Sequence, residues 1–164
     1  MHMNAIHCYE SPLGRIVMES DGERLTALRF EDREQAPETG NLPVFRETDR
    51  WLDVYFSGRD PGFTPPLLPQ GTPFRRAVWE ILLTIPYGRT TTYGKIATET
   101  AARMNVPKMS AQAVGGAVGH NPVSLIIPCH RVVGSDGSMT GYAYGTERKI
   151  RLLELEHAGL LSRR

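Results

Sequence analysis

Residues 121–132 read Asn-Pro-Val-Ser-Leu-Ile-Ile-Pro-Cys-His-Arg-Val. The apolar run from Val123 to Ile127 ends at Pro128, and the thiol of Cys129 and the imidazole of His130 follow at once. The run is too short for a helix, and we expect a buried strand or extended segment. A glycine-rich stretch, residues 134–145, comes next and is typical of a loop. The thiol and the imidazole therefore lie where an apolar segment meets a loop.

Adjacent cysteine and histidine side chains can support nucleophilic chemistry. A free thiol is only slightly ionised at neutral pH, so a reactive cysteine needs a base or a positive environment. His130 is a candidate base, directly or through a water, and Arg131 adds positive charge; the second ring nitrogen of His130 would need an acceptor, usually a carboxylate. Cysteine is also a common inert core residue, and neighbours on a strand point to opposite faces. These residues alone leave both interpretations open.

Metal binding is not expected. Besides Cys129 and His130 only His120 lies nearby in the sequence, and this set offers too few ligands for structural zinc.

Helical patterns flank this segment. Thr72 and Pro73 are typical of a helix start, and apolar residues then recur at helical spacing before Pro86. A second helix is predicted from about Thr92 and a third from Ser110. Such a pair is typical of a helix-turn-helix, although the connection over 100–109 is long for that motif. Two glycines inside the third helix, Gly115 and Gly116, suggest that another backbone or a ligand approaches closely.

The N-terminal part has a different pattern. Short strands are predicted over 5–9, 14–20 and 24–30, with a tight turn at Asp21-Gly22, and residues 31–44 are typical of a loop. A helical stripe over 51–56 ends at Gly58, and the proline-rich stretch 59–72 is typical of a linker. A last helix is predicted over 146–157, with Ile150, Leu153 and His157 on one face. We expect an N-terminal domain over 1–58, the linker 59–72 and a C-terminal domain over 73–164.

The charge is divided along the chain. The net charge is +1, but residues 1–72 carry 7 basic and 12 acidic side chains and residues 73–164 carry 12 basic and 6 acidic ones. A basic half suggests an anionic partner, with nucleic acid first; chance segregation or contact between the halves is the alternative. No stretch approaches the length of a membrane span, no secretory signal is visible, and two cysteines cannot form a disulfide framework. These features favour a cytoplasmic protein.

The segment Pro128-Cys-His-Arg-Val132 resembles the active-site motif of the O6-alkylguanine-DNA alkyltransferases, the methylated-DNA–protein-cysteine methyltransferases. The similarity extends over Ile85–Gly94, residues 111–145 and the last helix, and so covers most of residues 73–164. The resemblance implies a two-domain α/β (α+β) fold. Its N-terminal part would be a small β-sheet with a helix, ribonuclease H-like, and its C-terminal part a helical, winged-helix-like domain with the helix-turn-helix.

The resemblance also implies a reaction. In this family a cysteine thiolate takes the alkyl group from O6 of guanine irreversibly, without a metal or cofactor. Position by position, Cys129 would be the nucleophile, His130 a water-mediated base, Glu156 the carboxylate that orients it and Asn121 a support for the active-site turn. Tyr93 would help to protonate N3 of guanine as negative charge develops on the leaving base.

The expected partner is double-stranded DNA that carries O6-alkylguanine, bound by a monomer with no membrane contact. The target base must be extruded from the duplex, and the family places its recognition helix in the minor groove. The backbone carbonyls of Cys129 and Val132 would recognise the guanine amino group, and the N–H of Ala143 would face O6. The other residues that the resemblance places at the substrate or the DNA are Ala111, Gln112, Gly115, Arg131, Ser135 and Tyr144.

Two positions depart from the better-known members. Gln112 stands where they have an arginine that fills the gap left by the extruded base, and we expect weaker stabilisation of the extruded state. Tyr144 stands where many have glycine, and its ring is expected to narrow the alkyl pocket unless it points outward to DNA or solvent. Two rival functions remain: a non-catalytic lesion sensor of the same fold, and a Cys-His hydrolase.

Overall fold

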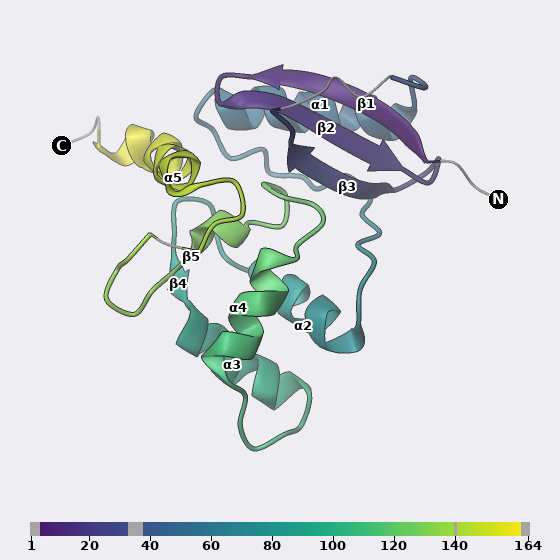
Figure 1. Cartoon of the computed structure of the whole chain (residues 1–164). Helices are drawn as coiled ribbons and strands as arrows, with labels where there is room; N and C mark the ends of the chain where they lie inside the picture. The colour runs from purple at the N-terminus through teal and green to yellow at the C-terminus, as the bar shows by residue number, and fades with distance from the viewer. Residues whose placement is uncertain (1–3, 33–37, 140, 162–164) are drawn as a thin grey trace. The chain divides into compact units, whose positions relative to one another are not determined.

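The computed structural model describes residues 4–32, 38–139 and 141–161, without the side chains of 158–161. Contacts within the chain divide it into two compact units (Figure 1). The N-terminal unit comprises Met1–Pro69 together with Pro122–Ser124 and Ala158–Arg164, and the C-terminal unit comprises Gln70–Asn121 and Leu125–His157. No helix in the described part of the chain is long and apolar enough to cross a lipid bilayer.

The N-terminal unit contains an antiparallel sheet in the order β1-β2-β3, formed by β1 (Ala5–Ser11), β2 (Gly14–Ser20) and β3 (Leu25–Phe30). The three predicted strands are confirmed. The tight turn that begins at Asp21 is confirmed as well, and Gly22 adopts a φ of 113° there, which glycine tolerates best.

Helix α1 (Pro43–Phe56) lies along one face of this sheet (Figure 1). It begins earlier than predicted, inside the stretch expected to be a loop. Pro43 occupies the first helical turn, where its missing N–H costs no hydrogen bond, and Val44, Phe45 and Thr48 extend the buried stripe toward the N-terminus. Residues 33–37 of the expected loop lie outside the described part.

The segment after α4 (Ala111–Gly119) joins the edge of the N-terminal sheet. Val123 forms a parallel bridge with Leu28, whose N–H donates to the carbonyl of Pro122 at 2.9 Å. The predicted strand over 123–127 is wrong beyond this single bridge. Leu125 has a φ of 71°, a left-handed conformation that ends extended structure and starts the turn leading to Cys129.

The C-terminal unit has a core of three helices, α2 (Pro73–Leu82), α3 (Tyr93–Arg103) and α4. Trp79 is buried among them, and its Nε1–H donates to the carbonyl of Ala117 at 2.8 Å. This bond ties α2 to the backbone of α4 and satisfies the polar edge of the largest side chain in this core.

All three helices begin where the sequence predicts. Thr72, Thr92 and Ser110 each accept a hydrogen bond from the backbone N–H three residues ahead, which satisfies a donor that the helix itself cannot pair. The helix pair α3 and α4 is therefore confirmed, with the expected long connection between its members.

The remaining elements surround Cys129. The 3₁₀ turn η1 (Cys129–Arg131) leads into β5 (Val132–Val133), which pairs in parallel with β4 (Thr91–Thr92). The final helix, α5 (Thr146–Leu161), is longer than predicted. Cys129 thus lies in a helical turn and not in a strand.

The buried face of α5 differs from the predicted one. Ile150 is 39% exposed, and the buried residues of this helix over 146–157 are Lys149, Leu152, Leu153 and Glu156. The apolar pattern suggested a face through Ile150, Leu153 and His157, because it did not count the two charged residues as inward-facing. Two turns separate Lys149 from Glu156, so both project from the same side of the helix.

A substitution at Gly71 tests how tightly the Trp79 ring is packed. A Cβ atom at Gly71 would lie 2.5 Å from the Trp79 ring, and this ring is only 2% exposed and cannot move aside. We expect Gly71→Ala to lower the free energy of unfolding by about 1–3 kcal/mol through overpacking, measured by urea denaturation. Gly40→Ala is the matched control, because a Cβ there meets nothing within 4 Å. Equal stability of the two variants would contradict this prediction.

Candidate active site

The turn that carries Cys129 is closed by an amide side chain. Asn121 is buried, and its Nδ2 donates to the carbonyl of Ile127 at 2.7 Å, across the turn that contains Leu125. Cys129 begins η1 directly after Pro128 and is 6% exposed. The Asn121 amide therefore fixes the backbone immediately before the thiol.

A buried carboxylate organises the residues next to Cys129. Glu156 is 3% exposed; its Oε2 accepts from His130 Nε2 at 2.5 Å, and its Oε1 accepts from Arg131 Nε at 2.8 Å and from the N–H of Gly88 at 3.1 Å. Three segments far apart in the sequence are thereby joined: α5, η1 and the turn before β4. The sequence predicted Glu156 as the partner of His130 from the resemblance, and the structure places the two in direct contact.

Arg131 belongs to this network. Its Nη1 donates to the carbonyl of Ile85 at 2.8 Å, its guanidinium lies over the Tyr87 ring, and the residue is 7% exposed. The sequence offered Arg131 as a DNA contact. In the structure its hydrogen bonds run to Glu156 and Ile85 inside the protein, so its charge supports the carboxylate and is not presented to a phosphate.

The pKa shifts of His130 and Glu156 define the protonation states of these two side chains. Burial lowers the pKa of His130, which favours the neutral ring. Burial alone would raise the pKa of Glu156, but the hydrogen bond donated by His130 and the charge and hydrogen bond of Arg131 outweigh it and lower that pKa to about 2. Glu156 is therefore an ionised acceptor at neutral pH. The Nε2 of His130 carries the proton that it donates, and Nδ1 carries the lone pair.

Tyr93 stands between two glycines. A Cβ at Gly141 would lie 3.0 Å from the Tyr93 hydroxyl, and a Cβ at Gly115 would lie 3.9 Å from its ring. Burial raises the pKa of Tyr93, and the negative charge of Cys129 raises it further. The phenol is thus a protonated donor whose charge environment includes the Cys129 thiol, and small residues on α4 and in the following loop make room for it.

Two residues near Cys129 were not predicted as functional. Burial, followed by the charge of Cys129, raises the pKa of Tyr142 well above its ordinary value. Lys149 is fully buried; burial lowers its pKa, while the negative charge of Cys129 raises it. A thiolate at Cys129 and the Lys149 cation therefore stabilise one another. The seven-residue spacing from Glu156 could have identified Lys149, because it places both residues on one helix face.

The other predicted residues lie at different depths. Ala111 and Gln112 are exposed at the start of α4, and Ser135 and Ala143 are exposed in the loop over 134–145. Val132 is buried in β5, which leaves only its backbone for recognition. A further member of the loop, Tyr144, is half-buried and packs edge-on against Tyr142, with ring centroids 5.6 Å apart.

The buried carboxylate generates a prediction about acid stability. Because the pKa of Glu156 is lowered from 4.5 to about 2, its contribution to folding is complete above about pH 4.5 and is lost as the pH falls toward 2. We expect the free energy of unfolding to fall over that range by on the order of 3 kcal/mol from this group. Urea denaturation at successive pH values measures this fall.

Glu156→Gln should remove most of that pH dependence and lower the stability at neutral pH, because it leaves Arg131 buried without its counter-charge. Glu154→Gln is the matched control, since Glu154 is exposed on the same helix. An unchanged acid profile in Glu156→Gln would contradict the network.

Comparison with known proteins identifies both parts of the chain. Residues 73–158 match the family model described as the DNA binding domain of 6-O-methylguanine DNA methyltransferase, and residues 5–69 match its ribonuclease-like domain. A methylated-DNA–protein-cysteine methyltransferase from Haemophilus influenzae is 46% identical over 154 residues, which cover 90% of this chain and 83% of that protein.

Solved structures agree over nearly the whole chain. The crystal structure of the Mycobacterium tuberculosis O6-methylguanine methyltransferase matches with a TM-score of 0.81 and 40% identity, covering 95% of this chain and 94% of that one. The same organism's OGT in complex with DNA matches with a TM-score of 0.80 and 41% identity, covering 92% and 91%. The α/β fold with two domains expected from the sequence is confirmed, and the chain belongs to the 6-O-methylguanine DNA methyltransferase family.

Proposed function

We propose that this protein repairs DNA by transferring an alkyl group, such as methyl, from O6 of guanine in duplex DNA to the sulfur of its own Cys129. The observation that carries the proposal is the hydrogen bond between His130 and the buried, ionised Glu156, directly beside Cys129. An imidazole oriented in this way, in a site that also contains the cations of Arg131 and Lys149, is what an otherwise weakly ionised thiol requires.

The reaction follows from these protonation states. His130 Nδ1 takes the thiol proton through a water, and Glu156 stabilises the imidazolium that forms. The thiolate attacks the alkyl carbon, a C–S bond forms, and the electrons of the broken C–O6 bond remain on guanine. The Tyr93 hydroxyl, kept protonated by its raised pKa, supplies a proton toward N3 as that charge develops. The thioether is stable, so each molecule acts once.

Two further residues, Lys149 and Arg131, support the reaction without contacting the alkyl group. The cation of Lys149 shares the buried environment of Cys129 and favours the thiolate over the thiol. Arg131 holds the carboxylate of Glu156 in the orientation that His130 needs. We therefore assign Arg131 to the support of the base, in place of the DNA contact that the sequence suggested.

Recognition of the lesion is assigned to exposed parts of the C-terminal unit. The start of α4, with Ala111 and Gln112, enters the minor groove, and Gly115 allows the close approach of a strand. The extruded guanine meets the backbone carbonyls of Cys129 and Val132. The loop residues Ser135, Ala143 and Tyr144 complete the pocket.

The protein acts as a monomer and needs no cofactor in this proposal. A cytoplasmic location stays a prediction from the sequence, which contains only two cysteines.

The two rival functions lack a supporting observation. A non-catalytic sensor of the same fold would not need the Cys129–His130–Glu156 arrangement, with its ionised carboxylate. A Cys-His hydrolase would turn over repeatedly and would not use an exposed helix pair of the DNA-binding kind.

Incubation with a duplex that contains O6-methylguanine tests the proposal. Mass spectrometry should detect one added methyl group per molecule, on the peptide that holds Cys129. Cys129→Ser should abolish the adduct, whereas Cys8→Ser should retain it as the matched control. Tight binding without an adduct would indicate a sensor, and repeated turnover a hydrolase; either result would overturn the proposal.

Tyr144 is expected to restrict the size of the alkyl group. Its ring packs against Tyr142, whose hydroxyl lies in the electrostatic environment of Cys129, so removing the ring widens the pocket. Tyr144→Gly should raise the rate of benzyl transfer about tenfold or more relative to methyl transfer, a difference of about 1.4 kcal/mol. Rates of adduct formation with the two modified duplexes give the ratio, and an unchanged ratio would contradict this role.

A further inference from the structure

The turn that precedes α5 carries one aromatic side chain into the interior of the C-terminal unit. The carbonyl of Tyr142 accepts a hydrogen bond from the N–H of Gly145 at 3.2 Å, and the carbonyl of Gly145 accepts one from the N–H of Lys149 in α5, also at 3.2 Å. Gly141 and Ala143, on either side of Tyr142 in the chain, are exposed, whereas Tyr142 is only 9% exposed. The closed turn therefore holds the phenol of Tyr142 in a buried position.

The hydroxyl of this phenol is buried without a hydrogen-bond partner among the described residues. Buried polar groups nearly always have a partner, because losing the hydrogen bonds to water without replacement is costly. The ring packs edge-on against Tyr144, with ring centroids 5.6 Å apart, and a phenylalanine ring would make the same contact. Packing therefore accounts for the ring of Tyr142 but not for its hydroxyl.

Tyr142 belongs to the environment of the candidate nucleophile. A Cβ atom at Gly141, the residue before it, would lie 3.0 Å from the Tyr93 hydroxyl. Burial raises the pKa of Tyr142 well above its ordinary value, and the negative charge of Cys129 raises it further. The Tyr142 hydroxyl thus stays protonated at neutral pH, and it is a hydrogen-bond donor that its own protein does not use.

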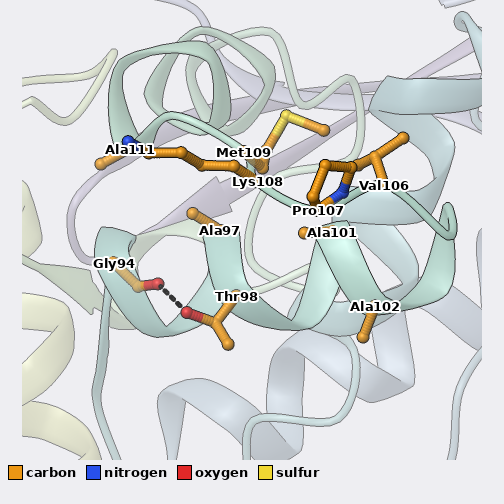
Figure 2. A pocket seen from close by; sticks show the side chains of 10 residues that line it. All are labelled: Gly94, Ala97, Thr98, Ala101, Ala102, Val106, Pro107, Lys108, Met109 and Ala111. Atoms are coloured by element: carbon orange, nitrogen blue, oxygen red, sulfur yellow. Dashed lines mark hydrogen bonds between the residues drawn. The ribbon is translucent and has the colours of Figure 1, made fainter.

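A cavity elsewhere in this unit does not include Tyr142. It has a volume of about 500 Å³ and lies between α3 and the connection to α4 (Figure 2). Small side chains such as Ala97 and Ala101 line it, and neither Cys129 nor Tyr142 does. This cavity is therefore separate from the surroundings of the thiol, to which Tyr142 belongs.

The proposed reaction determines which part of a substrate approaches this hydroxyl. The alkyl group lies between the sulfur of Cys129 and O6 of guanine, and O6 faces the N–H of Ala143, the residue that follows Tyr142. A methyl group ends at the carbon that the thiolate attacks. A longer alkyl group extends past that carbon toward the space beside Tyr142 and Tyr144.

We propose that the Tyr142 hydroxyl donates a hydrogen bond to an oxygen atom on the second carbon of the O6-alkyl group, so that Cys129 accepts 2-hydroxyalkyl groups in preference to apolar groups of the same size. A neutral oxygen suits this position better than a carboxylate, because the thiolate of Cys129 would repel a second negative charge. The inference rests on the proposed function, since it concerns the substrate of the same cysteine. Tyr142 is then a specificity-determining residue.

Tyr142→Phe tests the inference, because it removes the hydroxyl and keeps the ring. Duplexes with O6-(2-hydroxyethyl)guanine and O6-propylguanine carry alkyl groups of equal length, one polar and one apolar. The ratio of their rates of adduct formation at Cys129 should fall about three- to tenfold in this variant, through the loss of one neutral hydrogen bond. The ratio of methyl to propyl transfer should be retained, since neither group carries an oxygen atom. Mass spectrometry at successive times measures the rates.

Two matched variants separate this role from others. Tyr93→Phe should lower the rates for all three duplexes and leave both ratios unchanged, because proton donation toward N3 is common to every adduct. Tyr9→Phe, which removes a phenol hydroxyl from β1 of the N-terminal unit, should retain all three rates. Urea denaturation of Tyr142→Phe should give a free energy of unfolding no lower than that of the wild type, because no hydrogen bond within the protein is lost.

An unchanged ratio of hydroxyethyl to propyl transfer in Tyr142→Phe would overturn the inference. An equal fall for all three duplexes would also overturn it, because the hydroxyl would then act on the thiolate itself. A marked loss of stability would do the same by indicating a structural hydrogen bond. Failure of the proposed function is distinguishable from these results, because in that case the wild-type protein forms no adduct with any of the three duplexes.

Discussion

The candidate active site depends on the hydrogen bonds that the buried carboxylate of Glu156 accepts. An unpaired carboxylate in this position would be costly to bury, but two charged or ionisable side chains and one backbone N–H donate to it. The same three hydrogen bonds fix α5 against η1 and against the turn before β4. The orientation of the His130 ring and the folding of this region therefore have one physical cause.

Charge inside the C-terminal unit is distributed so that each group stabilises the protonation state of another. Arg131 and His130 lower the pKa of Glu156, Glu156 holds a proton on Nε2 of His130, and Lys149 shares the environment of Cys129. The basic character of residues 73–164 thus has two sources. Part of it lies inside the protein around the thiol, and part is exposed, as at Lys108. A count of charges along the chain does not distinguish the buried basic side chains from the exposed ones.

Local rules predicted the elements that depend on local interactions. The turn that begins at Asp21 separates two strands of the sheet, and Thr72, Thr92 and Ser110 cap their helices through hydrogen bonds from residues three positions ahead. The errors occur where distant contacts outweigh local preference. Val123 bridges Leu28 across the chain, and the left-handed Leu125 then breaks the apolar run that was expected to be extended.

The sequence by itself determined that a thiol and an imidazole lie together before a loop, and its resemblance to a family selected Glu156, Tyr93 and Asn121 as their companions. Only the tertiary structure decided that Arg131 faces inward, that Lys149 is buried near Cys129, and that Gly141 leaves room for the Tyr93 hydroxyl. The physical reason is that spacing along the chain defines helix faces and caps. The partner of a buried charge is defined by which segments pack together, and here 25 residues separate Arg131 from Glu156.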